Sequence, residues 1–418
     1  MLQKIKTYYK ISTPKPSINE DEATQTKRYK KLRVQSFLAA TIGYSLYYVC
    51  RTSINVVKQP ILDSGTLDAS HLGIIGSILL FSYAIGKFAN SFVADHSNIK
   101  RFMATGLIVS VLANFLIGFL GLVETKTIVL STTAFFILFA IIWGINGWAQ
   151  SMGAAPAIIS LSRWFPLKER GTFYGFFSAS HNLGEFLSFL FVGIIVGVVG
   201  WQWGFIGSSI SSVIGILVII FFLHDTPQSK GLPPVEILSK EVKTETDVAK
   251  ESILQTQRMV LKNPLVWILA LSSAFMYVSR YAINGWGVLF LQEAKGYALT
   301  TATQIISINA LLGVLGTIFS GWMSDKLFKG NRYIPAFLFG VINTLSLILF
   351  LYSGDSLFLN GLSMVLFGTA IGVLICFLGG LMAVDLVSRN ATGAALGIVG
   401  IASYMGAGIQ DIISGVLI

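Results

Sequence analysis

Long apolar runs of about 20 residues, separated by polar stretches, constrain this chain more than any other feature of its sequence. A helical run of that length matches the hydrocarbon thickness of a bilayer. Hydrophobic residues make up 54% of the 418 residues and charged residues only 12%, well below the share in a soluble domain. These features exclude a soluble enzyme, a disulfide scaffold and a disordered protein. Eleven membrane-spanning helices are predicted at 35–57, 72–94, 102–122, 128–160, 171–199, 203–223, 264–291, 302–324, 334–352, 357–384 and 392–418.

The chain repeats itself at a fixed offset, which indicates two related halves. Arg51 and Arg280 are 229 residues apart, and Asp95 and Asp325 are 230 apart. Three glycines of the fifth span recur 222 residues later in the eleventh. We therefore expect an all-α membrane protein built as two six-helix bundles. The predicted parts are a basic tail (1–34), an N-terminal bundle (35–223), a linker (224–262) and a C-terminal bundle (263–418). The repeat also predicts a twelfth helix that would begin near position 425, beyond this sequence.

The basic residues predict the orientation in the membrane. Of the 30 lysines and arginines, 24 lie in the tail, the linker and the loops on the same side as these. Because such residues accumulate on the cytoplasmic side, the N-terminus is predicted to be cytoplasmic. The loops on the other side hold only Lys58, Lys126 and Lys295. The net charge of +10 is thus explained by topology, and we expect a lipid bilayer rather than nucleic acid as the partner.

Ionisable residues inside the spans are the candidate functional residues. Each costs at least about 2.5–3.5 kcal/mol at the membrane centre, so such residues usually line a water-filled path or pair with one another. Arg51, Lys87 and Arg280 outnumber the carboxylates, Glu185 and Asp411, the latter nearer a span end. A path with surplus positive charge attracts an anion. Two arginines at matching positions predict a two-sided clamp, because guanidinium groups bind phosphate or carboxylate in a bidentate fork.

Other polar side chains share these helices. Helical spacing puts Tyr44 and Tyr48 on the face of Arg51, and Tyr83 on the face of Lys87. His181 lies four residues before Glu185, which would set the charge of the histidine or simply pair with it. Structural alternatives stay open: an arginine paired only for packing, a lysine that snorkels, a core histidine, and tyrosines at a membrane interface. The further candidates for lining the path are Tyr277, Tyr281 and Tyr404.

The loops after spans two and eight each carry an acidic residue followed by basic ones. Asp95 and Asp325 are predicted to latch one conformation through neighbouring helices, although plain topology is the alternative. The sequence contains no metal-ligand cluster, nucleotide-binding loop or catalytic triad, and we predict no cofactor and no enzymatic activity.

Taken together, these residues resemble the organophosphate:phosphate antiporter family of the major facilitator superfamily. That family includes bacterial glycerol-3-phosphate and hexose-6-phosphate transporters and a hexose-phosphate sensor. The matches extend over nearly the whole chain. They are Gly-Tyr44-x-x-x-Tyr48-x-x-Arg51, Tyr83-x-x-x-Lys87 with Asp95-x-Ser-Asn, Arg163-Trp-Phe-x-x-Lys-Glu-Arg-Gly171, Ser180-His181-Asn182-x-Gly184, His224-Asp-Thr-Pro-Gln-Ser-x-Gly-Leu-Pro233, Tyr277-x-x-Arg280 with Ala-Ile-Asn284-x-Trp286, and Gly321-Trp-x-Ser-Asp-Lys.

The resemblance implies exchange of an organic phosphate, such as a sugar phosphate or glycerol-3-phosphate, for inorganic phosphate. It also implies that Arg51 and Arg280 bind the phosphate, assisted by Lys87 and His181, while the tyrosines line the path. Asn284 and Trp286, on the same stretch as Arg280, complete the candidate substrate-binding set. We expect a monomer in a bacterial inner membrane.

The sequence departs from the family pattern at several positions. Ala310 stands where members usually carry a glutamate, and Gly285 stands where an aspartate is often found. Leu396 and Val399 stand where one branch of the family carries an aspartate and a lysine that favour hexose phosphate. These departures leave the organic substrate open, and Glu185, where glycine is expected, is a candidate replacement for the missing acid.

Three functions remain compatible with these residues: an antiporter, a sensor and a proton-coupled carrier. In an antiporter, two unpaired arginines would repel each other until a phosphate bridges them, so an empty carrier would cross slowly. A sensor of external hexose phosphate would instead signal to a membrane kinase. A proton-coupled carrier of another organic anion would use His181 and Glu185 to carry the proton.

Overall fold

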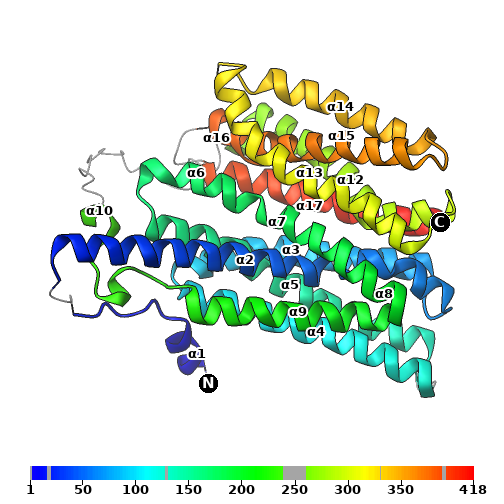
Figure 1. Cartoon of the computed structure of the whole chain (residues 1–418), viewed down its shortest axis with the longest axis horizontal. Coiled ribbons are helices and arrows are strands. Elements are labelled where there is room, and N and C mark those ends of the chain that lie inside the picture. The colour runs from blue at the N-terminus through cyan, green and yellow to red at the C-terminus, as the bar shows by residue number, and fades with distance from the viewer. Residues whose placement is uncertain (1, 17–19, 128–129, 239–259, 330, 388–391) are drawn as a thin grey trace.

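The computed structural model describes residues 2–16, 20–127, 130–238, 260–329, 331–387 and 392–418. The described residues are mostly helical, and two groups of long helices lie side by side (Figure 1). The N-terminal half consists of α2 (Glu22–Asp63), α3 (Ala69–Asp95), α4 (Ile99–Thr127), α5 (Thr132–Trp164), α6 (Leu167–Ser178), α7 (Ser180–Leu187), the π-helical turn η1 (Ser188–Val192), α8 (Gly193–Val199) and α9 (Trp201–Phe222). The C-terminal half consists of α12 (Pro264–Glu293), α13 (Leu299–Lys326), α14 (Tyr333–Tyr352), α15 (Leu357–Cys376), the π-helical turn η3 (Phe377–Leu381), α16 (Met382–Leu386) and α17 (Thr392–Leu417).

Ten of the predicted spans are confirmed as helices that are long and apolar enough to cross a membrane, within the described part of the chain. The first predicted span is a more polar, 42-residue helix, α2, which lies among the others. It extends well beyond 35–57, because Asp21 caps its start and accepts a hydrogen bond from the Thr24 amide. Lys58, predicted to lie in a loop, is therefore inside α2 and only 1% exposed, which corrects that interpretation.

Short polar side chains cap the start of several other helices. Each accepts a hydrogen bond from an amide in the first helical turn, which satisfies a donor that the helix leaves unpaired. These residues are Asp68 before α3, Ser131 before α5, Asn263 before α12 and Ser356 before α15. The apolar runs and their polar boundaries together determine where these spans start.

The two halves contact each other through α3 and α17, α2 and α12, and α7, η1 and α8 with α13. We call the end where α9 ends and α12 begins the linker end, and the opposite end the far end. At the far end Gly73 packs on α17 so closely that an added Cβ would lie 2.6 Å from the Asp411 carbonyl oxygen. Ser77 Oγ donates to the Gly408 carbonyl at 2.7 Å, and Gln59 donates to Glu293. Small residues and hydrogen bonds thus join the halves from the middle to the far end.

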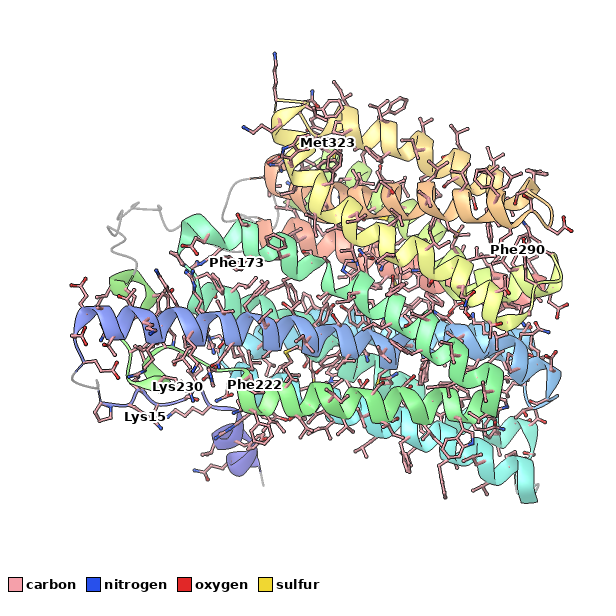
Figure 2. The ribbon with its side chains drawn as sticks, in the orientation of Figure 1. Lys15, Phe173, Phe222, Lys230, Phe290 and Met323 are labelled. Carbon is pink, nitrogen blue, oxygen red and sulfur yellow. The ribbon has the colours of Figure 1, made fainter. Side chains whose placement is uncertain are left out.

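At the linker end, the start of the predicted linker is packed onto the N-terminal half. Asp225 accepts hydrogen bonds from Arg163 at 2.5 Å, from the Ile99 amide at 3.1 Å and from the Ser12 amide at 2.7 Å. The amide of Lys15 donates to the carbonyl of Gln228, and Figure 2 places Lys15 and Lys230 close together there. Asp225 therefore ties the tail, α4 and α5 together.

We expect Asp225→Asn to lower the thermal stability of the protein, because the carboxylate is 2% exposed and serves three donors. Hydrogen bonds to a charged group contribute about 1.5–3 kcal/mol each, so the melting temperature in detergent should fall by several degrees. Proteolytic cleavage after Lys10 should also accelerate, since the tail loses its anchor. The exposed Asp355→Asn is the control. Equal melting curves for the two variants would contradict this role.

Candidate functional site

The two arginines predicted to form a clamp lie in opposite halves and are both buried. Arg51 on α2 is 4% exposed, and Arg280 on α12 is 2% exposed. Each reaches across the interface between the halves. Arg51 Nη2 donates to the Tyr281 hydroxyl at 3.0 Å, and Arg280 Nη2 donates to Glu185 Oε1 at 2.7 Å. The sequence analysis placed these residues inside two predicted spans, and the structure brings them to one interface.

The predicted tyrosines form one cluster around Arg51. Its guanidinium carbon lies 4.1 Å from the ring centre of Tyr83, 5.3 Å from that of Tyr48 and 5.5 Å from that of Tyr404. Tyr404 on α17 is the centre of the cluster, because its ring also contacts Tyr277 and Tyr281. The aromatic faces attract the cation, and the hydroxyls remain as donors and acceptors. Tyr44, packed on Tyr48 and Phe177, completes the set.

The predicted assisting residues lie beside this cluster. Lys87 on α3 points its ammonium group toward the ring of Tyr404, 5.5 Å from the ring centre, and its side chain is exposed in the protein. His181 on α7 is 8% exposed and its ring packs against Tyr48, 5.6 Å between centres. Lys87 thus lies beside Tyr404 and His181 beside Tyr48, two of the rings around Arg51, and no hydrogen bond joins either residue to the arginines in the described part of the protein.

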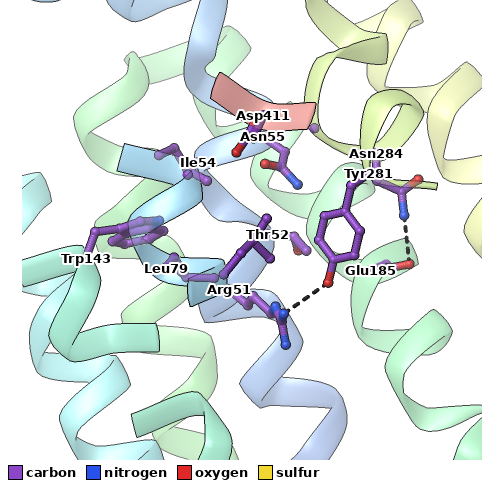
Figure 3. Close-up of a pocket in the computed structure, with 13 residues that line it drawn as sticks. Arg51, Thr52, Ile54, Asn55, Leu79, Trp143, Glu185, Tyr281, Asn284 and Asp411 are labelled. Atoms are coloured by element: carbon purple, nitrogen blue, oxygen red, sulfur yellow. Dashed lines mark hydrogen bonds between the residues drawn. The ribbon is translucent and has the colours of Figure 1, made fainter. Parts of the chain in front are cut away.

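A small cavity lies between the halves at this place (Figure 3). Its volume is about 30 Å³, which is room for about two water molecules. Its lining includes both charged groups and neutral polar groups. The polar and charged residues of its wall are Arg51, Thr52, Asn55, Glu185, Tyr281, Asn284 and Asp411. A phosphate ester is larger than this space, so binding requires the side chains or the halves to move apart.

Four buried polar atoms of the site have no hydrogen-bond partner among the described residues: Arg51 Nη1, Trp143 Nε1, His181 Nε2 and Asn284 Oδ1. Buried polar groups are nearly always satisfied by protein, water or a ligand. Three of these residues line the cavity, and the fourth, His181, is one helical turn from Glu185. The Arg51 Nη1 is therefore available to donate to a phosphate oxygen, whereas Asn284 Oδ1 can only accept, for example from a ligand hydroxyl.

A second charged cluster, which the sequence analysis missed, borders the cavity toward the far end. Lys58 on α2 lies 3.4 Å from Asp411 on α17, and its ammonium group is 3.3 Å from the ring centre of Trp286. The Trp286 indole donates to Asp411 at 2.5 Å. Gly285 leaves room for the pair, because a Cβ there would lie 3.7 Å from Asp411 Oδ1 and 3.9 Å from Lys58 Nζ. Trp286 contacts both members of the ion pair, whereas Asn284 lines the cavity; a role of either in substrate binding stays a prediction.

Two predicted gating residues are outside what the structure describes in detail. Asp95 ends α3 and Asp325 lies in the last turn of α13, but their side chains lie outside the described part of the protein. Their role as latches stays a prediction.

The comparisons with known proteins agree with this architecture. The model of the Major Facilitator Superfamily matches residues 40–410. Among solved structures, a bacterial homologue of the human lysosomal transporter Spinster, inward-facing and unoccupied, superimposes with a TM-score of 0.73 at 19% identity, covering 92% of this chain and 82% of that one. A D-xylose–proton symporter gives a TM-score of 0.65 at 14% identity, covering 91% and 89%. These likenesses concern the fold.

Curated relatives are similar over most of both chains. A probable hexose phosphate transport protein of Chlamydia pneumoniae is 34% identical, covering 93% of this chain and 86% of that one. The glycerol-3-phosphate transporter of Bacillus subtilis is 31% identical, covering 95% and 88%. The membrane sensor protein UhpC of Escherichia coli is 31% identical, covering 91% and 85%. The resemblance to the organophosphate:phosphate antiporter family is thereby confirmed, and the chain belongs to the Major Facilitator Superfamily as a multi-pass membrane protein.

Proposed function

We propose that this protein carries phosphate esters across a membrane, exchanging an organic phosphate such as a sugar phosphate or glycerol-3-phosphate for inorganic phosphate. The observation that carries the proposal is a pair of buried arginines at the interface, one from each half: Arg51 lines the cavity, and Arg280 is paired with Glu185, which also lines it. The names of the relatives, which include hexose phosphate and glycerol-3-phosphate transporters, support the same class of substrate.

The balance of charge at the site supports a doubly negative ligand. Each carboxylate around the cavity already has its own cation, Glu185 with Arg280 and Asp411 with Lys58. Arg51 and Lys87 then remain as two positive charges with no carboxylate partner among the described residues. A phosphate monoester carries close to two negative charges at neutral pH. The tyrosine hydroxyls, Asn55 and Asn284 are suited to hydroxyl groups of an organic portion.

The mechanism follows from where the ligand binds. A phosphate between Arg51 and Arg280 would bond to both halves at once, which favours their approach and lets them rock around the occupied site. The present contacts from the middle to the far end support a state closed at that end. Inorganic phosphate presents the same oxygens to the same arginines, so it competes with the ester and can return in exchange for it.

We place the protein in a bacterial inner membrane, as a monomer, with the tail and the linker end in the cytoplasm. The distribution of lysine and arginine in the sequence supports this orientation. We expect no enzymatic activity and no cofactor.

The proposal is tested with purified protein in liposomes loaded with inorganic phosphate. Labelled glycerol-3-phosphate and glucose-6-phosphate are supplied outside, one at a time. We expect uptake of at least one ester, inhibition by external phosphate, and a several-fold stimulation by internal phosphate over internal sulfate. Uptake that follows a pH gradient and ignores phosphate on either side would contradict exchange. Arg51→Ala liposomes provide the background value.

A sensor is the second candidate, because the sensor UhpC of Escherichia coli is similar to this chain over most of its length. A sensor would bind hexose phosphate through the same arginines and pass a signal to a membrane kinase. Binding of glucose-6-phosphate without any transport in the same liposomes would favour it.

A further inference from the structure

Arg280 is already occupied by an anion of the protein itself. Glu185, on α7 of the N-terminal half, lies 2.7 Å from Arg280 on α12 of the C-terminal half. The side chains are 4% and 3% exposed, so water screens this ion pair little. The second carboxylate oxygen accepts a hydrogen bond from Asn284 at 3.1 Å (Figure 3). A position that a phosphate would take on Arg280 is thus filled by a carboxylate of the protein itself.

The Glu185–Arg280 ion pair has the two effects expected of a bound phosphate: it neutralises an arginine and links the two halves. A carboxylate and a phosphate both bind a guanidinium through oxygen atoms with negative charge. Glu185 neutralises Arg280, and it links the two halves because the partners come from opposite sides of the interface. Arg51 is likewise held across the interface by the neutral hydroxyl of Tyr281. The mutual repulsion of two unpaired arginines, expected from the sequence for the empty state, is therefore relieved.

We propose that Glu185 is a built-in substitute for phosphate that lets the empty carrier change its conformation, so that the protein also performs net transport of phosphate esters. This inference rests on the function proposed above and extends it. If the empty protein had two uncompensated cations at the interface, it would return only with a second phosphate bound, and exchange would be obligatory. With Glu185 on Arg280, the return step needs no phosphate.

The same residue also competes with the substrate. An entering phosphate must take Arg280 from Glu185, because a guanidinium has a limited number of donors. The displaced carboxylate keeps the hydrogen bond from Asn284, which limits the cost of leaving it without its cation. Removing the carboxylate should therefore strengthen phosphate binding while it slows the return of the empty protein.

The test separates net transport from exchange in liposomes. Potassium and valinomycin hold the membrane potential at zero, since net movement of a dianion carries charge. Uptake of labelled glycerol-3-phosphate is measured with internal phosphate (exchange) and with internal sulfate alone (net transport). For the unmodified protein we expect net uptake at about a tenth of the exchange rate or more. For Glu185→Gln we expect net uptake to fall at least about tenfold, with exchange retained and half-maximal at a lower concentration.

Glu293→Gln is the matched control, because Glu293 also bonds across the halves, to Gln59, but lies at the far end outside the cavity wall. Glu293→Gln should change the rate of net uptake and the rate of exchange by the same factor. Exchange without net uptake in the unmodified protein would overturn the inference and leave the proposed function standing. Absence of both modes would instead refute the proposed function.

The ratio of net uptake to exchange decides the variant result. An unchanged ratio in Glu185→Gln overturns the inference. If glutamine abolishes both modes, Glu185→Ala, which also removes the bond to Asn284, is measured. Exchange without net uptake in that variant supports the substitute role. Loss of exchange there as well overturns it, because Glu185 would then be needed for the loaded protein.

Discussion

Replacing Arg51 by lysine should raise the phosphate concentration for half-maximal exchange by about 10- to 100-fold. Arg51 offers the cavity a buried Nη1 that has no partner among the described residues, beside an Nη2 that bonds to Tyr281. Lysine keeps the charge but loses the planar fork that binds two oxygens at once. A hydrogen bond between charged groups contributes about 1.5–3 kcal/mol, and 1.4 kcal/mol corresponds to a factor of ten in affinity. Exchange in liposomes as a function of phosphate concentration measures the shift.

The equivalent change at Arg280 should have a smaller effect on affinity. Lysine at this position would bind phosphate less well, but it would also bind the competing Glu185 less well, and the two losses partly cancel. Arg101→Lys is the control, because Arg101 lies at the linker end and bonds to the Tyr8 carbonyl, away from the cavity. Normal exchange in Arg51→Lys would refute the bidentate clamp.

The central part of the site was predictable from the sequence because charge inside a membrane is expensive. Arg51, Arg280 and Glu185 stand out against apolar runs, and the repeat pairs the two arginines. Helical spacing was sufficient to put Tyr44, Tyr48 and Arg51 on one face of α2. What spacing does not determine is which helices lie against each other. The contact between Glu185 and Arg280, 95 residues apart, therefore became visible only in the folded chain.

Lys58 was misread for a different physical reason. It stands at the edge of an apolar run, where a lysine is usually exposed in a loop, and its partner Asp411 is 353 residues away. Only the fold places the Asp411 carboxylate and Gly285 beside it. Trp286 was assigned to the substrate because it lies on the same stretch as Arg280, and the structure shows its indole donating to Asp411.

The fold was predictable at the level of spans, and less so within them. The run 171–199 appeared as one helix in the sequence, whereas the structure divides it into α6, α7, η1 and α8. The π-helical turn at Ser188–Val192 leaves no signature in the hydrophobic pattern, because the run stays apolar throughout. The turn begins three residues after Glu185, which itself lies within α7.

The Lys58–Asp411 pair should show strong non-additivity when its members are replaced. Removing one partner of a buried ion pair leaves an uncompensated charge and costs about 3–5 kcal/mol. Lys58 is 1% exposed, so we expect Lys58→Met and Asp411→Asn each to lower the melting temperature in detergent by several degrees. The double variant should lose much less than the sum, because neither charge remains. Additive losses would indicate that the two side chains act independently.

The double variant then tests whether the pair holds the far end closed. Lys58 and Asp411 belong to opposite halves, so opening that end must separate them and a protein without either charge should open more often. Ser70, whose hydroxyl bonds to the Gly415 carbonyl across the halves at 3.2 Å, is a suitable reporter as Ser70→Cys. We expect a water-soluble maleimide to label it about tenfold faster in the double variant. The Arg332→Met/Asp385→Asn background, which removes an ion pair within the C-terminal half, should leave the rate unchanged. Equal labelling in both backgrounds would limit Lys58 and Asp411 to local packing.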